Sequence, residues 1–339
     1  MFSDYIILFF SIFMFCFFLI YAISYIYEKI YIKNDFISTL AGPCIFLSFI
    51  LFSFLYINNV LLIFNNMYEL IIFYFSIFLI VIIGLIDDFV RIDTFKKIIF
   101  QIFIIILSIH GLNLDHIFIS PLFSNYYINY IFLMIFILGF MNSINLIDGI
   151  DNIAAMLSIV ISMFFILLAK VIAFNEINIF FYMVIGSLLS YLLYNNLCKR
   201  IFIGDAGSLF LGWLFSIISI FFISFSNEVT IFFPFAFLFI PVFDVIYVMI
   251  FRFYNANDRS YLDRLKSIFI PDKTHLHHSL LKLGINSFMI CFILCLILSS
   301  ISFIYIKYIF YFDIIYKYLF INILFAIYMF FRIRIDRLI

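Results

Sequence analysis

Long apolar runs recur along the whole sequence, and each is about as long as a membrane is thick. A helix needs roughly 20 apolar residues to cross a bilayer, whereas a barrel strand would show about 10 residues of alternating polarity. The composition agrees, because 68% of residues are hydrophobic and 11% are charged, against about 25% charged in soluble domains. The sequence therefore predicts an all-α integral membrane protein, with residues 1–339 forming a single polytopic domain.

The apolar runs predict eleven transmembrane helices and no internal repeat. The expected spans are 5–27, 39–57, 68–86, 95–112, 126–144, 153–174, 177–195, 208–226, 230–253, 285–305 and 315–333.

The basic residues are distributed unequally between the two faces that these spans define. Lys170, Lys307 and Lys317 fall on one face, and the other sixteen of the nineteen Lys and Arg fall on the second. The positive-inside rule makes the basic face cytoplasmic, which predicts an external N-terminus and a cytoplasmic C-terminus. The net charge of +0 indicates no affinity for nucleic acid. The residues on the basic face are Lys29, Lys33, Arg91, Lys96, Lys97, Lys199, Arg200, Arg252, Arg259, Arg264, Lys266, Lys273, Lys282, Arg332, Arg334 and Arg337.

The polar stretches gather on the same predicted face. They are GLIDDFVRIDTFKK, the island NSINLIDGIDN, NNLCKRIFIGDAGS, and the cytoplasmic loop 252–284 with its PDKTHLHH stretch. A carrier would more often bury its polar groups near the bilayer midplane. The pattern therefore favours an enzyme that handles a cytosolic substrate at the membrane surface, and a multi-span carrier or flippase is the alternative from another class.

Asp87 and Asp88 stand next to each other where a predicted helix ends. Carboxylates are unfavourable at the negative end of a helix dipole. A nearby cation would explain the pair, as would a raised proton affinity that suits general-base work. Asp93 is better explained as the cap of the next helix.

Asn145, Asp148 and Asp151 follow one another at intervals of three residues in an island without Lys or Arg. If the segment is helical, all three approach one face. Carboxylates beside amide oxygens suit a hard cation such as Mg²⁺. The alternative is a polar turn, with Gly149 as the helix breaker and Asn152 as a cap.

The stretch Gly204–Ser208 follows the basic pair Lys199–Arg200 and opens a predicted helix. Small residues allow close backbone approach, and free N–H groups at a helix start attract phosphate. Asp205 is a candidate ligand for a metal that bridges phosphates, and an ordinary capped helix start is the alternative.

Three of the five histidines, His275, His277 and His278, lie within four residues. They suit phosphate binding or proton transfer, and no Cys or HExxH companion supports a zinc site. Asp244 lies in the apolar run FLFIPVFDVIYVMIF, where a carboxylate is costly. We expect it to face the same cleft or to brace it.

These stretches together resemble the polyprenyl-phosphate N-acetylhexosamine-1-phosphate transferases, the glycosyltransferase 4 family. The resemblance runs from about residue 39 to residue 284. It is carried by LIDD at 85–88, NSINLIDGID at 142–151, FIGDAGS at 202–208 and HLHH at 275–278, with PVFD at 241–244 as a weaker fifth motif. The form THLHHSLLKLG resembles the branch that loads N-acetylglucosamine-1-phosphate onto undecaprenyl phosphate.

The resemblance implies a role for each matching residue. The catalytic candidates are Asp87, Asp88, Asp148 and His275. The metal ligands are Asp205 and Asn145, for Mg²⁺ or alternatively Mn²⁺. The substrate-binding candidates are Lys97, Asn145, Asp151, His277, His278 and Asp244.

The sequence departs from the family pattern at several positions. Asn152 stands where a Gly is usual after the DGxD core, Arg91 replaces an acidic residue, and the first loop KNDFISTLAGP lacks its usual basic and histidine stretch. An inactive family member is therefore one alternative.

The resemblance implies that a UDP-N-acetylhexosamine donates a phospho-sugar to undecaprenyl phosphate and releases UMP. It places the protein in the bacterial inner membrane, with the active site facing the cytoplasm, and leaves a homodimer open. A phospho-N-acetylmuramoyl-pentapeptide transferase is the alternative within the family.

Overall fold

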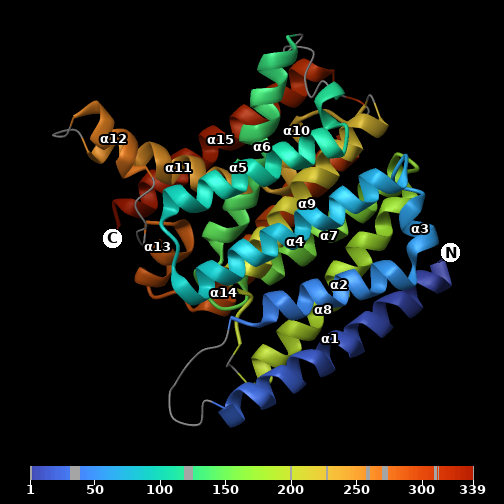
Figure 1. Ribbon diagram of the computed structural model, residues 1–339. Helices are drawn as coiled ribbons and strands as arrows, with labels where there is room; N and C mark the ends of the chain where they lie inside the picture. Colours follow the sequence, from blue (N-terminus) through green and yellow to red (C-terminus); the bar gives the residue numbers. More distant parts are fainter. Residues whose placement is uncertain are drawn as a thin grey trace.

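The computed structural model describes residues 2–30, 39–117, 125–198, 201–226, 228–256, 260–268, 274–308, 311 and 313–338. Within these ranges the regular structure is helical and contains no strand (Figure 1), which confirms the all-α prediction. Lys33, Lys199, Arg200, Arg259 and Lys273, counted above among the basic residues, lie outside the described residues, as do the side chain of Lys29 and most of the first loop.

Nine described helices are long and apolar enough to cross a membrane, so the chain is a multi-span membrane protein. One of them, α8, is preceded by a short 3-10 helix, η2 (Asn175–Ile177). The nine are α1 (Phe2–Ile30), α4 (Met67–Val90), α5 (Thr94–Gly111), α6 (Tyr126–Ile147), α7 (Ile153–Val171), α8 (Asn178–Cys198), α9 (Gly204–Phe225), α14 (Ser287–Tyr308) and α15 (Ile314–Asp336).

Two predicted spans correspond to shorter helices. The span 39–57 is α2 (Ala41–Leu55), followed by α3 (Ile57–Leu61), and the span 230–253 is divided into α10 (Phe232–Phe237) and α11 (Phe239–Asn255). Pro241 explains the division, because its ring lacks an N–H and would clash with the carbonyl four residues earlier in a continuous helix. The number of spans and their orientation remain predictions.

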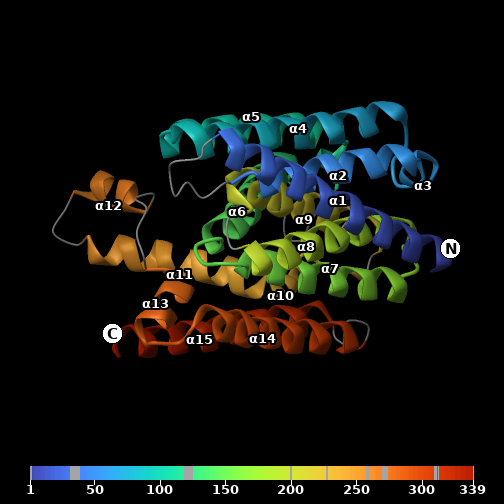
Figure 2. The same cartoon turned by 90° about the horizontal axis from the view of Figure 1, so that it is seen from below.

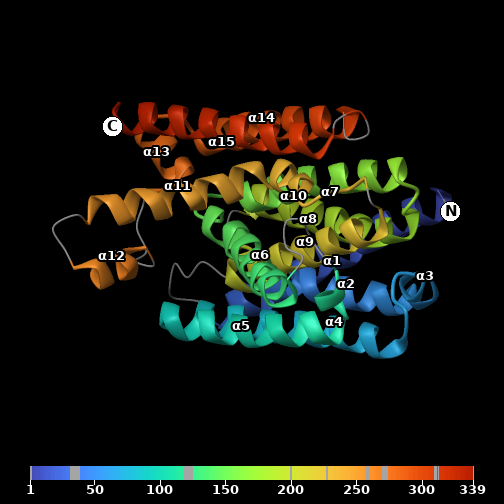
Figure 3. The same cartoon turned by 90° about the horizontal axis from the view of Figure 1, so that it is seen from above.

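The helices pack in layers. Figures 2 and 3 show α4 and α5 on one side, α14 and α15 on the opposite side, and α6 to α11 between them. The short helices η1 (Leu114–His116), α12 (Tyr261–Ser267) and α13 (Leu276–Lys282) complete the described structure. The two termini lie at opposite ends of the bundle, and α12 and α13 lie at the end that holds the C-terminus.

Small residues bring α2 and α4 unusually close to the start of α9. A Cβ added at Gly84 would lie 2.4 Å from the Cα of Ala206, and one added at Gly42 would lie 2.4 Å from the backbone nitrogen of Gly207. Glycine and alanine at such crossings let backbones approach, as is common between membrane helices. The crossing of α4 and α9 sets Asp88 beside Asp205.

We predict that Gly84→Ala destabilises the protein, because the added methyl overlaps the α9 backbone rather than a flexible side chain. Overpacking of this kind costs about 1–3 kcal/mol. Gly139→Ala in α6 is the matched control, since nothing lies within 4 Å of an added Cβ there. Thermal unfolding in detergent should show a lower midpoint for Gly84→Ala alone, and equal midpoints for both variants would contradict the packing argument.

Candidate functional site

Asp88 links the end of α4 to the start of α9. Its Oδ1 accepts the backbone N–H of Asp205 at 3.0 Å, and its Oδ2 accepts that of Ala206 at 3.4 Å. The helix begins at Gly204, four residues before the predicted start, so Asp205 lies in its first turn. The sequence predicted that free N–H groups here would attract phosphate, and in the structure two of them already bind the Asp88 carboxylate.

Lys97 in the first turns of α5 lies between two carboxylates. Its ammonium donates to Asp87 Oδ2 at 2.7 Å and to Asp205 Oδ2. Asp87 Oδ1 also accepts the Ile92 N–H at 2.6 Å. The cation expected beside the Asp87–Asp88 pair is therefore Lys97. Asp93 caps α5 as predicted, by accepting from the N–H of Phe95.

Asn145 joins the same cluster from the last turn of α6. With its amide oriented to suit both neighbours, it donates to Asp205 Oδ1 at 3.2 Å and accepts from Lys97 Nζ at 3.1 Å. Four helices, α4, α5, α6 and α9, thus each contribute one side chain to a single polar cluster. We call Asp87, Lys97, Asn145 and Asp205 the central cluster.

The condition under which Asn145, Asp148 and Asp151 would share one helical face is not met, because the segment is not helical throughout. The helix ends at Ile147, Asp148 is its C-cap with φ −73° and ψ 42°, and Asp151 is exposed in the following turn. The alternative of a polar turn is the correct one. Asp148 is still affected by the charges around it. Burial and the negative charges of Asp205, Asp88 and Asp151 raise its pKa to about 8.

The histidine motif packs directly on this turn. A Cβ added at Gly149 would lie 2.3 Å from His277 Nε2 and 3.1 Å from His278 Nε2. His277 is 1% exposed, and neither ring nitrogen has a hydrogen-bond partner in the described part of the chain. Burial lowers its pKa to about 3, so the ring is neutral at neutral pH. The structure therefore brings two distant motifs together.

Asp244 is placed to brace this motif. The side chain is 1% exposed. Its Oδ2 lies 2.8 Å from His275 Nδ1, and its Oδ1 accepts the Leu276 N–H at 3.0 Å. Of the two roles expected for Asp244, these contacts favour bracing, and a role in substrate binding stays a prediction.

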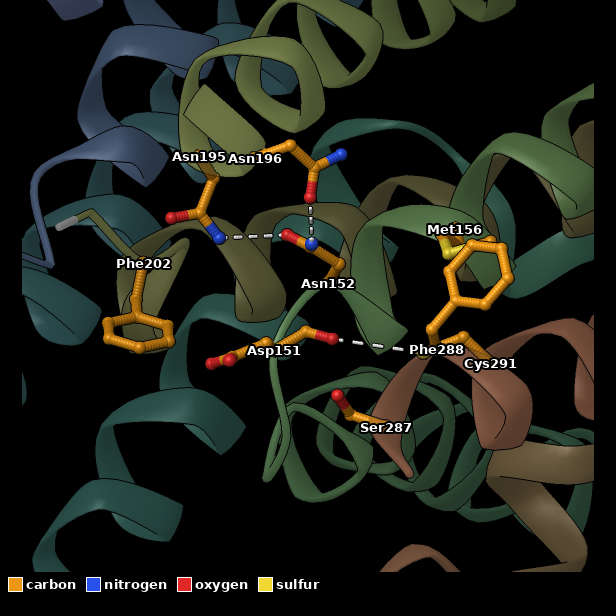
Figure 4. Close-up of a pocket in the computed structure, with 9 residues that line it drawn as sticks. All are labelled: Asp151, Asn152, Met156, Asn195, Asn196, Phe202, Ser287, Phe288 and Cys291. Atoms are coloured by element: carbon orange, nitrogen blue, oxygen red, sulfur yellow. Dashed lines mark hydrogen bonds between the residues drawn. The ribbon is translucent and has the colours of Figure 1, made fainter. Parts of the chain in front are cut away.

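A separate pocket adjoins the turn and is drawn in Figure 4. Asn152 lies at φ 67°, a left-handed conformation that Gly adopts freely and Asn tolerates better than most residues. This accounts for Asn where the family usually has Gly. The Asn152 amide accepts from Asn195 at 2.9 Å and donates to Asn196 at 3.1 Å. The pocket is lined by Asp151, Asn152, Met156, Asn195, Asn196, Phe202, Ser287, Phe288 and Cys291.

The carboxylate and amide oxygens of the central cluster are of the chemical type that binds a divalent cation, but they are few. The described residues contain no group of three His, Cys, Asp or Glu side chains poised around one point, and the Lys97 ammonium lies between Asp87 and Asp205. Mg²⁺ needs only one or two carboxylates when substrate phosphates complete its shell. Asp205 and Asn145, the predicted ligands, are the residues that would hold it.

Residues 70–223 match the model of glycosyl transferase family 4. The chain carries a glycosyl transferase family 4 domain. That domain contributes the whole central cluster, whereas the histidine motif and Asp244 lie beyond its matched segment. The matched segment contains three of the four motifs, LIDD, NSINLIDGID and FIGDAGS, and confirms the family resemblance that they carry.

Individual relatives point to two branches of the family. The chain is 32% identical over 243 residues to the probable undecaprenyl-phosphate N-acetylglucosaminyl 1-phosphate transferase of Bacillus subtilis, a match that covers 68% of this chain and 64% of that protein. It therefore spans a little under two thirds of that relative's length. Phospho-N-acetylmuramoyl-pentapeptide-transferases match over less of the chain, with 44% identity over 93 residues in Streptococcus suis (26% of this chain and 27% of that protein) and 32% over 147 residues in Clostridioides difficile (38% and 46%).

Sequence reasoning missed several polar residues of this region. Gln101 of α5, 1% exposed, exchanges two hydrogen bonds with Asn142 of α6 and fixes the register of those helices beside the cluster. Asn195 and Phe202 line the pocket without having been singled out. A buried amide in an apolar span was the available signal for Gln101 and Asn195. Phe202 is the first residue of the FIGDAGS motif, but no role of its own was predicted for it.

We predict that Lys97→Met destabilises the protein by about 3 kcal/mol, because it leaves Asp87 and Asp205 facing each other without a cation. Lys96→Met is the control, since Lys96 is exposed one residue earlier on the same helix. Adding Asp205→Asn to Lys97→Met should restore part of the loss. Thermal melts that show the two lysine variants to be equal would contradict the assignment.

Proposed function

We propose that the protein transfers N-acetylhexosamine-1-phosphate, in particular N-acetylglucosamine-1-phosphate, from a UDP-sugar to undecaprenyl phosphate and releases UMP. The observation that carries the proposal is the central cluster, in which four helix ends of a family 4 domain converge on one lysine. The name of the Bacillus subtilis relative, a probable undecaprenyl-phosphate N-acetylglucosaminyl 1-phosphate transferase, supports the same acceptor and the same transferred group.

In the proposed reaction, an oxygen of the lipid phosphate bonds to the sugar-side phosphorus of the donor. The bond from that phosphorus to the bridging oxygen breaks, and UMP leaves with the electron pair. Such transfers depend on charge neutralisation and in-line placement more than on covalent help. Lys97 is suited to contact the incoming phosphates, and Asp87 and Asp88 hold the helix ends that place it.

The pocket of Figure 4 suits the nucleoside of the donor. Phe202 offers an aromatic face for stacking, and the Asn152–Asn195–Asn196 amides offer both donors and acceptors to the polar edge of a base. Phe202 also lies three residues before Asp205 in the chain, so base and diphosphate would be held by neighbouring residues. A bound Mg²⁺ would supply positive charge to the diphosphate.

The membrane setting follows from the two reactants. Undecaprenyl phosphate is too apolar to leave the bilayer, whereas a UDP-sugar is a cytosolic solute. We therefore place the protein in the bacterial inner membrane with the central cluster at the cytoplasmic surface. The central cluster lies at helix ends, and most Lys and Arg residues fall on the face predicted to be cytoplasmic. Both features support this orientation.

A direct assay tests the proposal. Purified protein is mixed with undecaprenyl phosphate, Mg²⁺ and a panel of UDP-N-acetylhexosamines, and UMP is measured. Release of UMP with the UDP-N-acetylglucosamine donor is expected. Release only with UDP-N-acetylmuramoyl-pentapeptide would assign the protein to the other branch, and none with any donor from folded protein would refute the proposal.

We predict that Asp205→Asn lowers UMP release by about 100-fold or more, because it removes a charge from the point where phosphates and metal would meet. Asp93→Asn is the control. Asp93 is an exposed carboxylate at the start of α5, and Asn caps a helix equally well. Loss of activity in both variants would mean that the assay reports general damage rather than a role of Asp205.

A further inference from the structure

The helix α15 holds the histidine motif through buried polar side chains. Among the described residues of α15, the buried ones are Lys317, Tyr328 and Arg332, although most of the helix is exposed on the surface of the bundle. Tyr328 and Arg332 are four residues apart and therefore lie on one helical face. Burying an arginine is costly unless it is paired, so its partners show what this face contacts.

Arg332 is 1% exposed and reaches three elements. Its guanidinium donates to the Thr274 carbonyl immediately before the histidine motif and to the Asp336 carboxylate, and it lies 4.9 Å from the centroid of the Tyr247 ring on α11. The Tyr247 hydroxyl in turn donates to Asp336 at 2.6 Å. The arginine therefore ties α15 both to α11 and to the backbone that leads into α13.

Tyr328 contacts the histidine motif indirectly, through Asp244. Its hydroxyl donates at 2.8 Å to Asp244 Oδ1, the oxygen that also accepts the Leu276 N–H. Arg332 Nε lies 3.7 Å from that same oxygen. Asp244, which fixes His275, is thus itself fixed from α15.

The motif needs such support because α13 is only seven residues long. A helix of that length has little stability of its own, so the orientation of His277 and His278 against Gly149 depends on what holds the start of α13. Figures 1 and 3 show α13 beside α11 and α15 at the C-terminal end of the bundle.

We propose that Tyr328 and Arg332 are positioning residues for the histidine motif. Through Asp244 and Thr274 they hold His277 and His278 against the Asp148–Asp151 turn, which adjoins the pocket that the proposed function assigns to the nucleoside of the donor. The inference rests on the proposed function for its kinetic consequence, but the geometry it asserts can be measured without any reaction.

The structural readout is the reactivity of individual histidines toward diethyl pyrocarbonate, measured by mass spectrometry on the full-length protein. In the wild type, His277 should be protected and His116, whose side chain is 79% exposed, should react. Arg332→Met and Tyr328→Phe should expose His277 to the reagent. Lys317→Met is the matched control, because Lys317 is also buried on α15 but donates to the Glu228 carbonyl near the other end of the helix.

The kinetic readout separates positioning from loss of folded protein. Arg332→Met should raise the KM for the UDP-sugar at least about tenfold and leave the KM for undecaprenyl phosphate unchanged. Arg332→Lys, which keeps the charge, should recover part of the loss. A simple loss of folded enzyme would lower the maximal rate and change neither KM.

Protection of His277 in both Arg332→Met and Tyr328→Phe would overturn the proposal, as would equal exposure of His277 in Lys317→Met. An unchanged donor KM in an active Arg332→Met enzyme would also overturn it. If the wild type releases no UMP, the proposed function fails, and the histidine labelling still decides whether α15 holds the motif.

Discussion

The contact of the Lys97 ammonium with Asp87 and Asp205 is the interaction on which the rest of the site depends. It joins the end of α4, the start of α5 and the start of α9 through one charge, at a place where apolar packing gives way to polar groups. Removing the cation would leave carboxylates close together in a poorly solvated position, which is far more costly than an exposed pair. The close crossing at Gly84 and Ala206 makes this geometry possible, because a larger residue would hold α4 away from α9.

Much of the architecture could be predicted from the sequence, because membrane-spanning helices are set by length and hydropathy. All eleven predicted spans have a helical counterpart in the described residues, and the two that differ in form do so for local reasons such as Pro241. Helix ends were harder to place. The helix α9 begins at Gly204, four residues before its predicted start, so Asp205 lies in its first turn. The helix α6 runs past its predicted end but stops at Ile147, so Asp148 lies just outside it.

The sequence predicted which residues belong to the site, but it did not predict which of them contact one another. The motifs identified Asp87, Asp88, Lys97, Asn145, Asp148, Asp205 and the histidines, and the structure brings these residues to one end of the bundle. The spacing of residues in the sequence does not determine the tertiary packing. It therefore could not predict which carboxylates Lys97 contacts, or that Asp88 caps α9. Arg332 shows the limit most clearly: in the sequence it is one more basic residue at a helix end, and in the structure it is enclosed.

The two buried cations of α15 also constrain how the protein can be assembled in a membrane. Lys317 and Arg332 are separated by fifteen residues, about 22 Å along a helix. While α15 is alone in lipid, each can extend its side chain toward the nearer of the two membrane surfaces. Asp336 lies on α15 itself, but their other partners, the Glu228 carbonyl, Asp244 and the Thr274 carbonyl, belong to other parts of the chain. Docking of α15 therefore exchanges water and lipid headgroups for protein partners, and it supplies the contacts that hold the histidine motif.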